Sequence, residues 1–243
     1  MSDEEKEIKT PERETYSPSK RNFFKIMGIV AIGAFSVGSL NGVIRYLIPS
    51  EAPSMSAFPT LTLVNSSGKT INTADIIVNA PQIVLFKYPL TDEPNFLLRL
   101  GDANNKDVEI KPSTVTIPLT GKTFSSPGGV GPYKSIVAAS AICMHLGCQP
   151  PNLVYHLPTD SSFPGKIHCD CHGSTYDPFN GFSVVTTPTK EPLPNIILKY
   201  DATQDSYQVN GMVGPTVYGH TNNLSEGSPL PSTTSTSTYT VSG

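Results

Sequence analysis

Two short stretches decide how this chain folds: Cys143-Met144-His145-Leu146-Gly147-Cys148, called box one below, and Cys169-Asp170-Cys171-His172-Gly173-Ser174-Thr175-Tyr176, called box two. Together they contain all four cysteines and two of the five histidines of the chain. One residue separates Cys143 from His145, and two residues separate Cys169 from His172. Such spacing lets a tight turn aim both side chains of a pair at one point. Two facing turns would surround a metal with two thiolates and two imidazoles.

Three kinds of site fit two cysteines and two histidines. They are a structural zinc ion, a pair of disulfides with idle histidines, and a [2Fe–2S] cluster in which cysteines hold one iron and histidines the other. A second pair of cysteines, Cys148 and Cys171, is left over beside the ligand pairs. A zinc site has no need of this second pair.

The boxes resemble those of the Rieske proteins, specifically the disulfide-bearing branch that oxidises quinols, in which C-x-H-L-G-C is followed by C-x-C-H-G-S-x-Y. The resemblance extends over roughly residues 19–213, but only the boxes are specific by themselves. It implies an all-β Rieske fold, with antiparallel sheets and an inserted cluster-binding subdomain at about residues 137–187. It also implies one Rieske [2Fe–2S] cluster as cofactor.

The resemblance assigns a role to nine residues of the two boxes. His145 and His172, the proposed catalytic residues, would bind the outer iron and take up the proton of a quinol. Cys143 and Cys169 would bind the inner iron, and Cys148 and Cys171 would form a disulfide. Ser174 and Tyr176 would donate hydrogen bonds to sulfur, and Leu146 would be the apolar residue that shields the cluster.

Two features depart from the family pattern. Between His145 and Cys169 lie 23 residues, more than is usual, so we expect an extra surface excursion at Tyr155 to Pro164. Asp170 stands where the family commonly has proline, which places a carboxylate beside the cluster. An ionised carboxylate there should lower the reduction potential.

The first 59 residues predict export and anchoring. Residues 1–25 form a cytoplasmic tail that ends in Ser19-Lys20-Arg21-Asn22-Phe23-Phe24-Lys25, which resembles a twin-arginine signal. Residues 26–46 contain a run of 19 uncharged residues, long enough to span about 28 Å of bilayer as a helix. Basic residues are more frequent before this run than after it, and no cleavage site follows it, so we expect a retained anchor with the head outside the cell. Residues 47–59 would form a linker.

Residues 60–218 are predicted to form the Rieske domain, and residues 219–243 a mobile tail rich in serine and threonine. Prolines and glycines interrupt the domain often, which favours strands joined by irregular loops. Strand signals occur at 60–64, 83–88, 96–100, 114–119, 135–142, 182–186, 195–200 and 206–209. Residues 125–132 should be a loop, and Pro188 to Pro194 resembles the family's third, proline-rich loop over the cluster.

The other three histidines are not expected to be ligands. His156 lies in the excursion and should be exposed, whereas His168 should point away from Cys169 because side chains alternate along a strand. His220 begins the predicted tail and should be inert. The net charge of −3 gives no electrostatic reason to expect nucleic acid as a partner.

These features predict the electron-transfer subunit of a quinol-oxidising membrane complex, without turnover of its own. Its partners would be quinol, a cytochrome b-like membrane subunit, and a cytochrome or oxidase subunit as electron acceptor. Two alternatives stay open: the Rieske small subunit of another exported oxidoreductase such as arsenite oxidase, and a zinc- or disulfide-stabilised binding module outside the cell.

Overall fold

The computed structural model describes residues 57–242, and this part of the chain contains strands and two single-turn 3-10 helices but no α-helix. Nothing within these residues is helical and apolar over a stretch long enough to cross a bilayer. The predicted tail at 1–25, the anchor at 26–46 and most of the linker lie outside the described residues. The strands are β1 (Leu61–Val64), β2 (Ile83–Lys87), β3 (Pro94–Arg99), β4 (Ser113–Thr116), β5 (Thr123–Ser126), β6 (Ile136–Ser140), β7 (Leu153–Tyr155), β8 (Ile167–Cys169), β9 (Thr175–Asp177), β10 (Ser183–Thr186), β11 (Asn195–Asp201), β12 (Ser206–Val213) and β13 (Ser235–Val241).

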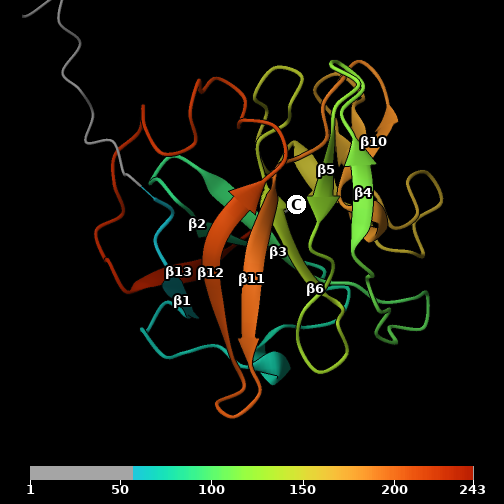
Figure 1. Ribbon diagram of the computed structural model, residues 1–243. Helices are drawn as coiled ribbons and strands as arrows, with labels where there is room; N and C mark the ends of the chain where they lie inside the picture. The colour runs from blue at the N-terminus through green and yellow to red at the C-terminus, as the bar shows by residue number, and fades with distance from the viewer. Residues whose placement is uncertain (1–56, 243) are drawn as a thin grey trace, which may run out of the picture. The chain divides into compact units, whose positions relative to one another are not determined.

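Seven strands close into a barrel in the order β1-β12-β11-β6-β3-β2-β13 (Figure 1). Adjacent strands are antiparallel except β1 and β13, which run parallel with Leu63 opposite Thr236. Large apolar side chains such as Leu61, Phe86 and Tyr207 are fully buried in one core cluster. The predicted all-β, largely antiparallel head is therefore confirmed.

The wall formed by β2, β3 and β6 is buried on both faces. Successive residues of these strands belong to different core clusters: Leu85 and Phe96 to one, and Phe86 and Leu97 to the other. All five residues of β6 are buried. The cluster that contains Leu85 and Phe96 also contains residues of the four-stranded sheet β10-β9-β8-β7, so this sheet packs against the outer face of the wall. The packing fixes the sheet that carries box two to the strand that leads into box one.

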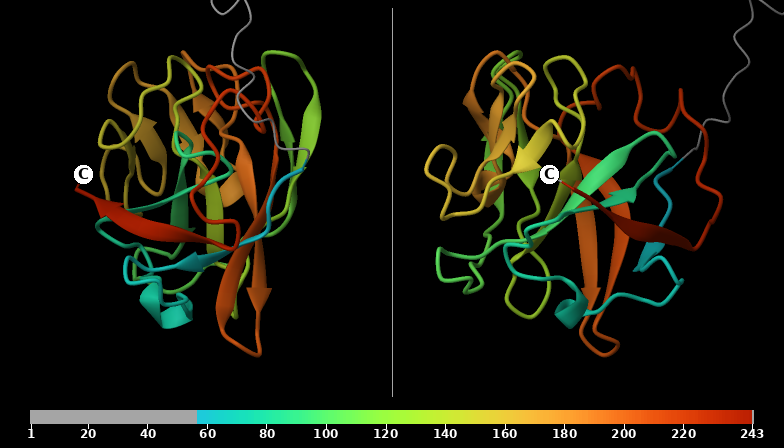
Figure 2. Two further views of the ribbon diagram at one scale, coloured as in Figure 1. Left: turned by 90° about the vertical axis from the view of Figure 1, so that its left-hand side faces the viewer. Right: turned by 180° about the vertical axis from the view of Figure 1, so that it is seen from behind.

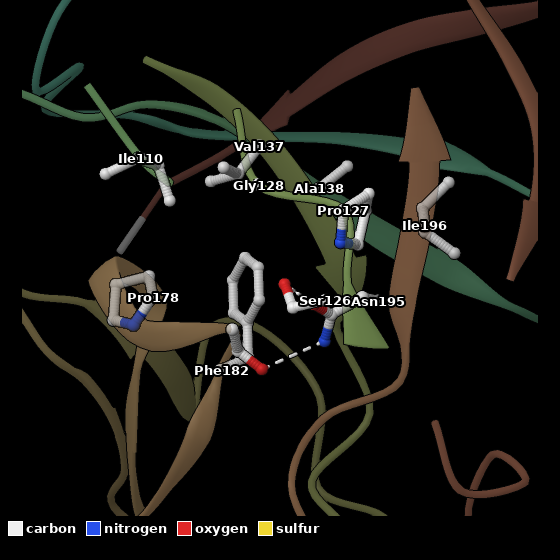
Figure 3. Close-up of a pocket in the computed structure, with 11 residues that line it drawn as sticks. Ile110, Ser126, Pro127, Gly128, Val137, Ala138, Pro178, Phe182, Asn195 and Ile196 are labelled. Atoms are coloured by element: carbon white, nitrogen blue, oxygen red, sulfur yellow. Dashed lines mark hydrogen bonds between the residues drawn. The ribbon is translucent and has the colours of Figure 1, made fainter. Parts of the chain in front are cut away.

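Asn195, at the start of β11, ties the barrel to the residues around box two. Its amide nitrogen donates to the carbonyls of Gly181 and Leu193 at 3.0 and 2.9 Å, and its amide oxygen accepts from the hydroxyl of Ser126 at 2.7 Å. Figure 3 shows this side chain between Phe182 and the barrel strands. A buried amide with these contacts is well satisfied, and such a joint is rigid.

The prediction of a mobile tail at residues 219–243 is wrong. Ser235–Val241 form β13, which pairs with β1 on one side and with β2 on the other (Figure 2). Only Thr236 of this strand is buried, so backbone hydrogen bonds rather than apolar side chains hold it in place. Threonine occupies every second position of this strand, and β-branched residues favour strands even in a polar sequence.

The predicted strands are otherwise found at or near their expected positions. The strands next to the two boxes were harder to predict, because β7, β8 and β9 have only three residues each. The predicted loop at 125–132 begins inside β5, which pairs with β4 as a two-stranded sheet. The strand predicted at 206–209 continues through Gly211 to Val213.

Candidate metal centre

The two boxes are loops with the same backbone hydrogen-bond pattern. In box one, the amide of Cys143 donates to the carbonyl of Cys148 at 2.8 Å, and the amide of Gly147 donates to the carbonyl of Cys143 at 2.9 Å. In box two, Cys169 donates to Ser174 at 2.9 Å, and Gly173 to Cys169 at 2.8 Å. Gly147 and Gly173 both have positive φ, +76° and +89°, which glycine adopts without strain. Each loop therefore begins at a cysteine held by two backbone bonds.

The cysteines that begin the loops, Cys143 and Cys169, are free and buried. The thiol of Cys143 neighbours that of Cys169, and both residues belong to the core cluster between the barrel wall and the four-stranded sheet. Burial, followed by the neighbouring Cys143, raises the pKa of the Cys169 thiol to about 11. A bound metal ion would displace the thiol protons, because thiolate is the ligand form of cysteine.

His145 and His172 lie beside one another with ring centroids 4.9 Å apart and ring planes at 82°. His172 is exposed and His145 half-buried. The Nδ1 atom of His145 is buried and has no hydrogen-bond partner among the described residues. A buried ring nitrogen without a partner is unfavourable unless something binds it, so the donor set fits a metal group between the two loops.

Cys148 and Cys171 form a disulfide that joins the two loops, as predicted. The sulfur of Cys169 lies within 4.8 Å of both disulfide sulfurs. These three atoms are not a ligand set, because two of them are bonded to each other. The disulfide instead sets the distance between the loops.

Tyr176 and Ser174 lie behind the loops, fully buried. The Tyr176 hydroxyl oxygen accepts from the amide of Met144 at 3.0 Å and lies 3.3 Å from the sulfur of Cys143. Burial, then the nearby Cys143, raises the pKa of this phenol far above its ordinary value. The Ser174 oxygen accepts from the amide of Thr189 at 3.2 Å. Each hydroxyl thus uses its oxygen for a backbone amide and keeps its proton for another partner.

Thr189 belongs to the proline-rich segment 188–194, so the predicted third loop does contact box two. The amide of Leu119, beyond β4, donates to the carbonyl of Lys190 in the same segment at 2.9 Å. The segment is thereby held from two sides.

The excursion between the boxes lies at the surface and folds back onto His168. Phe163 stacks on the His168 ring with centroids 3.6 Å apart, and the Nδ1 atom of His168 lies 2.8 Å from the hydroxyl of Thr175. Burial lowers the pKa of His168, with Asp170 opposing. His156 is half-buried rather than exposed, because its ring packs near Phe163 and its Nδ1 atom lies 3.2 Å from Asp160.

Asp170 directs its carboxylate outward: the side chain is 62% exposed and lies 3.8 Å from the Nε2 atom of His168. Leu146, predicted to shield the cluster, is 54% exposed at the tip of box one. Sequence reasoning missed Tyr218, whose ring covers Gly147 so closely that a Cβ atom there would lie 2.9 Å from Tyr218 Cδ1. Tyr218 is the last residue of the predicted domain at 60–218, and no local pattern marks its contact with box one.

Residues 105–197 match the family model described as the Rieske [2Fe-2S] domain. The ubiquinol-cytochrome c reductase iron-sulfur subunit of Allochromatium vinosum is 37% identical over 70 residues, 28% of this chain and 34% of the relative. The match thus spans about a third of that protein's length.

Among solved structures, the soluble domain of the Rieske protein II (soxF) from Sulfolobus acidocaldarius is similar to this chain with a TM-score of 0.51 and 27% identity. The likeness covers 72% of this chain and 88% of that domain. These matches set aside the alternative of a structural zinc ion or of a module held by disulfides alone.

Proposed function

Because the chain carries a Rieske domain that binds a [2Fe–2S] cluster, we propose that it is the iron-sulfur subunit of a quinol-oxidising membrane complex. It would receive an electron and a proton from quinol and pass the electron to a cytochrome or oxidase subunit. The observation that carries the proposal is the arrangement of two buried thiols, Cys143 and Cys169, behind two imidazoles of which one is exposed. A partner that approaches this face would therefore meet the imidazoles and not the thiols.

Cys143 and Cys169 would bind the inner iron, and His145 and His172 the outer iron. For His145 the ligating atom is Nδ1, since that atom is buried and otherwise unpartnered. The bound cluster supplies a one-electron acceptor of raised potential, because neutral imidazoles replace two thiolates. The Nε2 atom of His145 then stays free to accept a hydrogen bond, and afterwards the proton, from quinol.

Tyr176 and Ser174 would donate their hydroxyl protons to sulfur. The support is that each hydroxyl oxygen already accepts a hydrogen bond from a backbone amide. The hydroxyl proton of each residue therefore has no other role in the described contacts. Donors directed at sulfur stabilise an added electron and raise the potential. Leu146 would keep water from the histidines by covering them on the side that a partner approaches.

We place the head on the outer side of the membrane, carried by the retained anchor at residues 26–46 with the N-terminus in the cytoplasm. The support is the basic flank before the apolar run, together with the Cys148 to Cys171 disulfide, which persists in an oxidising compartment. The partners would be a cytochrome b-like membrane subunit and a cytochrome or oxidase acceptor. The relative named as a ubiquinol-cytochrome c reductase subunit supports this assignment.

Electron paramagnetic resonance of membranes and of purified protein tests the proposal. Dithionite should produce the signal of a reduced [2Fe–2S] cluster with histidine ligands, and a quinol should produce the same signal in membranes. A cluster that dithionite reduces but no quinol reduces would overturn the quinol role while leaving the cofactor in place. Recovery of the chain in the soluble fraction after salt washing would overturn the anchor.

A further inference from the structure

A buried carboxyl group lies outside the metal centre and has no role in it. Glu93, in the turn between β2 and β3, is 0% exposed, and neither of its carboxyl oxygens has a hydrogen-bond partner among residues 57–242. One of them, Oε1, lies 3.3 Å from Nδ1 of His220, which is also buried and has no hydrogen-bond partner there. The His220 side chain is 11% exposed. His220 is therefore not the inert histidine that its sequence position predicts.

Several charged groups surround this pair. Asp92 lies 3.9 Å from Nε2 of His220, and Glu226 is close enough to interact electrostatically with the same ring. Glu191 and Lys122 line the surface pocket that His220 also lines. The carboxylates thus outnumber the single lysine, which favours a proton on the pair.

Glu93 and His220 must share one proton beyond that of the neutral imidazole to be compatible with burial. A neutral imidazole could offer its single N–H to a buried carboxylate, but the pair would then keep a net negative charge away from water, which is unfavourable. With the additional proton, either the acid donates to the imidazole or an imidazolium pairs with the carboxylate. Burial, then Asp92, raises the pKa of Glu93 to about 8.

Glu93 and His220 lie at the C-terminal end of the segment that covers box one. Within segment 214–220, which follows β12, residues 215–220 line a pocket together with Met144 of box one, and the ring of Tyr218 lies against Gly147. His220 follows two residues later, and its amide donates to the carbonyl of Val217 at 3.0 Å. Further along, Ser228 accepts from the amide of Thr91 in the same turn as Glu93 at 2.9 Å. A contact at His220 therefore fixes Tyr218 with respect to box one.

We propose that Tyr218 is a positioning residue for box one and that Glu93 and His220, sharing a proton, hold it in place. While the pair keeps that proton, Tyr218 packs on Gly147 and limits the motion of the loop that carries Cys143 and His145. Loss of the proton leaves the pair with a net negative charge away from water and close to Asp92, and segment 214–220 opens. The inference concerns the chain's own packing and stands whether or not quinol is the electron donor.

The direction of the pH dependence follows from Glu93. A carboxyl group whose pKa is raised by folding stabilises the closed arrangement fully below its ordinary pKa, and this contribution is lost as pH rises through the folded value, about 8. Between the ordinary value of 4.5 and about 8, opening should increase by up to about tenfold per pH unit. Above about 8 the carboxyl group is ionised in both arrangements, so opening should level off, and below 4.5 the segment should stay closed.

Hydrogen exchange measured by mass spectrometry on the full chain tests the proposal. Wild type and Glu93→Gln are compared at about pH 5 and about pH 8, close to the ordinary and to the folded pKa of Glu93. Peptides covering 141–149 and 214–224 have identical sequences in both proteins, so intrinsic exchange rates cancel in the ratio. For both peptides, we expect the ratio of the wild-type rate to the Glu93→Gln rate to be at least about tenfold larger at the higher pH than at the lower pH. A ratio that does not change with pH would overturn the proposal.

Two further variants keep the test decisive. Glu109→Gln makes the same chemical change at an exposed carboxylate paired with Lys134, and it should follow wild type at both pH values. Tyr218→Ala should speed exchange of 141–149 at both pH values while 219–224 keeps its pH dependence. If Glu93→Gln does not fold, wild type against Tyr218→Ala still decides: a pH dependence of 141–149 that survives in Tyr218→Ala would exclude the positioning role.

Discussion

Box one and box two share one backbone pattern but differ in what covers them. Box two is held by residues near it in sequence, since Ser174 lies inside it and Thr189 follows in the proline-rich segment. Box one is held by Tyr176 from behind and by Tyr218 from a segment that begins after β12. His172 of box two is exposed, whereas His145 of box one is half-buried.

The difference shows that equal ligands need not be equally restrained. Local sequence builds each turn and aims its cysteine and histidine, but the freedom left to the turn depends on what packs over it. In this protein the tighter cover lies over box one and comes from far along the chain. The following substitutions break or sharpen that contrast.

The largest effect is expected from removing either histidine of the centre. His145→Ala and His172→Ala should each lose the cluster almost completely, because each would remove one of the two ligands of the outer iron. Iron and acid-labile sulfide per chain, with the visible spectrum, measure the loss. His156→Ala is the matched control and should retain the cluster. Full retention in both ligand variants would refute the assignment.

The next largest effect is expected from separating the loops. Replacing both Cys148 and Cys171 by serine removes a crosslink that spans 23 positions. Loop-closure entropy predicts a loss of about 3 kcal/mol in the free energy of unfolding. Urea unfolding of the oxidised wild type and the double variant measures it. Equal midpoints would mean that packing alone holds the two loops together.

A smaller effect distinguishes box one from box two most directly. Gly147→Ala and Gly173→Ala both place a Cβ atom at positive φ, which costs about 1 to 2 kcal/mol in each. Only Gly147→Ala also meets the Tyr218 ring, whereas the space around Gly173 is open. We expect Gly147→Ala to be more destabilising by about 1 kcal/mol in urea unfolding. The excess should vanish in a Tyr218→Ala background, and an excess that persists would show that Tyr218 does not cover the loop.

The smallest effect is expected from the hydroxyl donors, one behind each loop. Tyr176→Phe and Ser174→Ala should each lower the reduction potential by on the order of 60 mV, because a hydrogen bond to a charged group contributes about 1.5 kcal/mol. The cluster should remain bound. Protein-film voltammetry at fixed pH measures the shift. Potentials within error of wild type in both variants would remove the donor roles.

The parts of the fold that sequence predicted well are those whose signal is local. Strands such as β2 and β11 contain runs of β-branched and aromatic residues between turn residues, and they were found where expected. The strand β13 was not predicted, because most of its residues carry hydroxyl side chains and disordered segments have a similar composition. Its stability comes from the open edges of β1 and β2, which no local pattern reveals.

The residues of the candidate site fall into the same two groups, those marked by a local signal and those brought together by long-range contacts. The cysteines, histidines, Ser174 and Tyr176 lie within two short motifs, so their spacing alone brings them together. Tyr218, Glu93 and His220 come together only through the chain's path around the barrel. Glu93 also breaks the rule that acidic residues are exposed, and a single sequence offers no sign of such an exception.

The parallel pairing of β13 with β1 has a consequence for how the head is made. The barrel joins residues near position 62 to residues near position 236, so during synthesis β1 stays unpaired on that side until residues near position 236 have emerged from the ribosome. Contacts of such long sequence separation slow folding. Shortening the chain before residue 235 would leave two bare strand edges, which favour aggregation. The barrel can therefore close only after residues near position 236 have been synthesised.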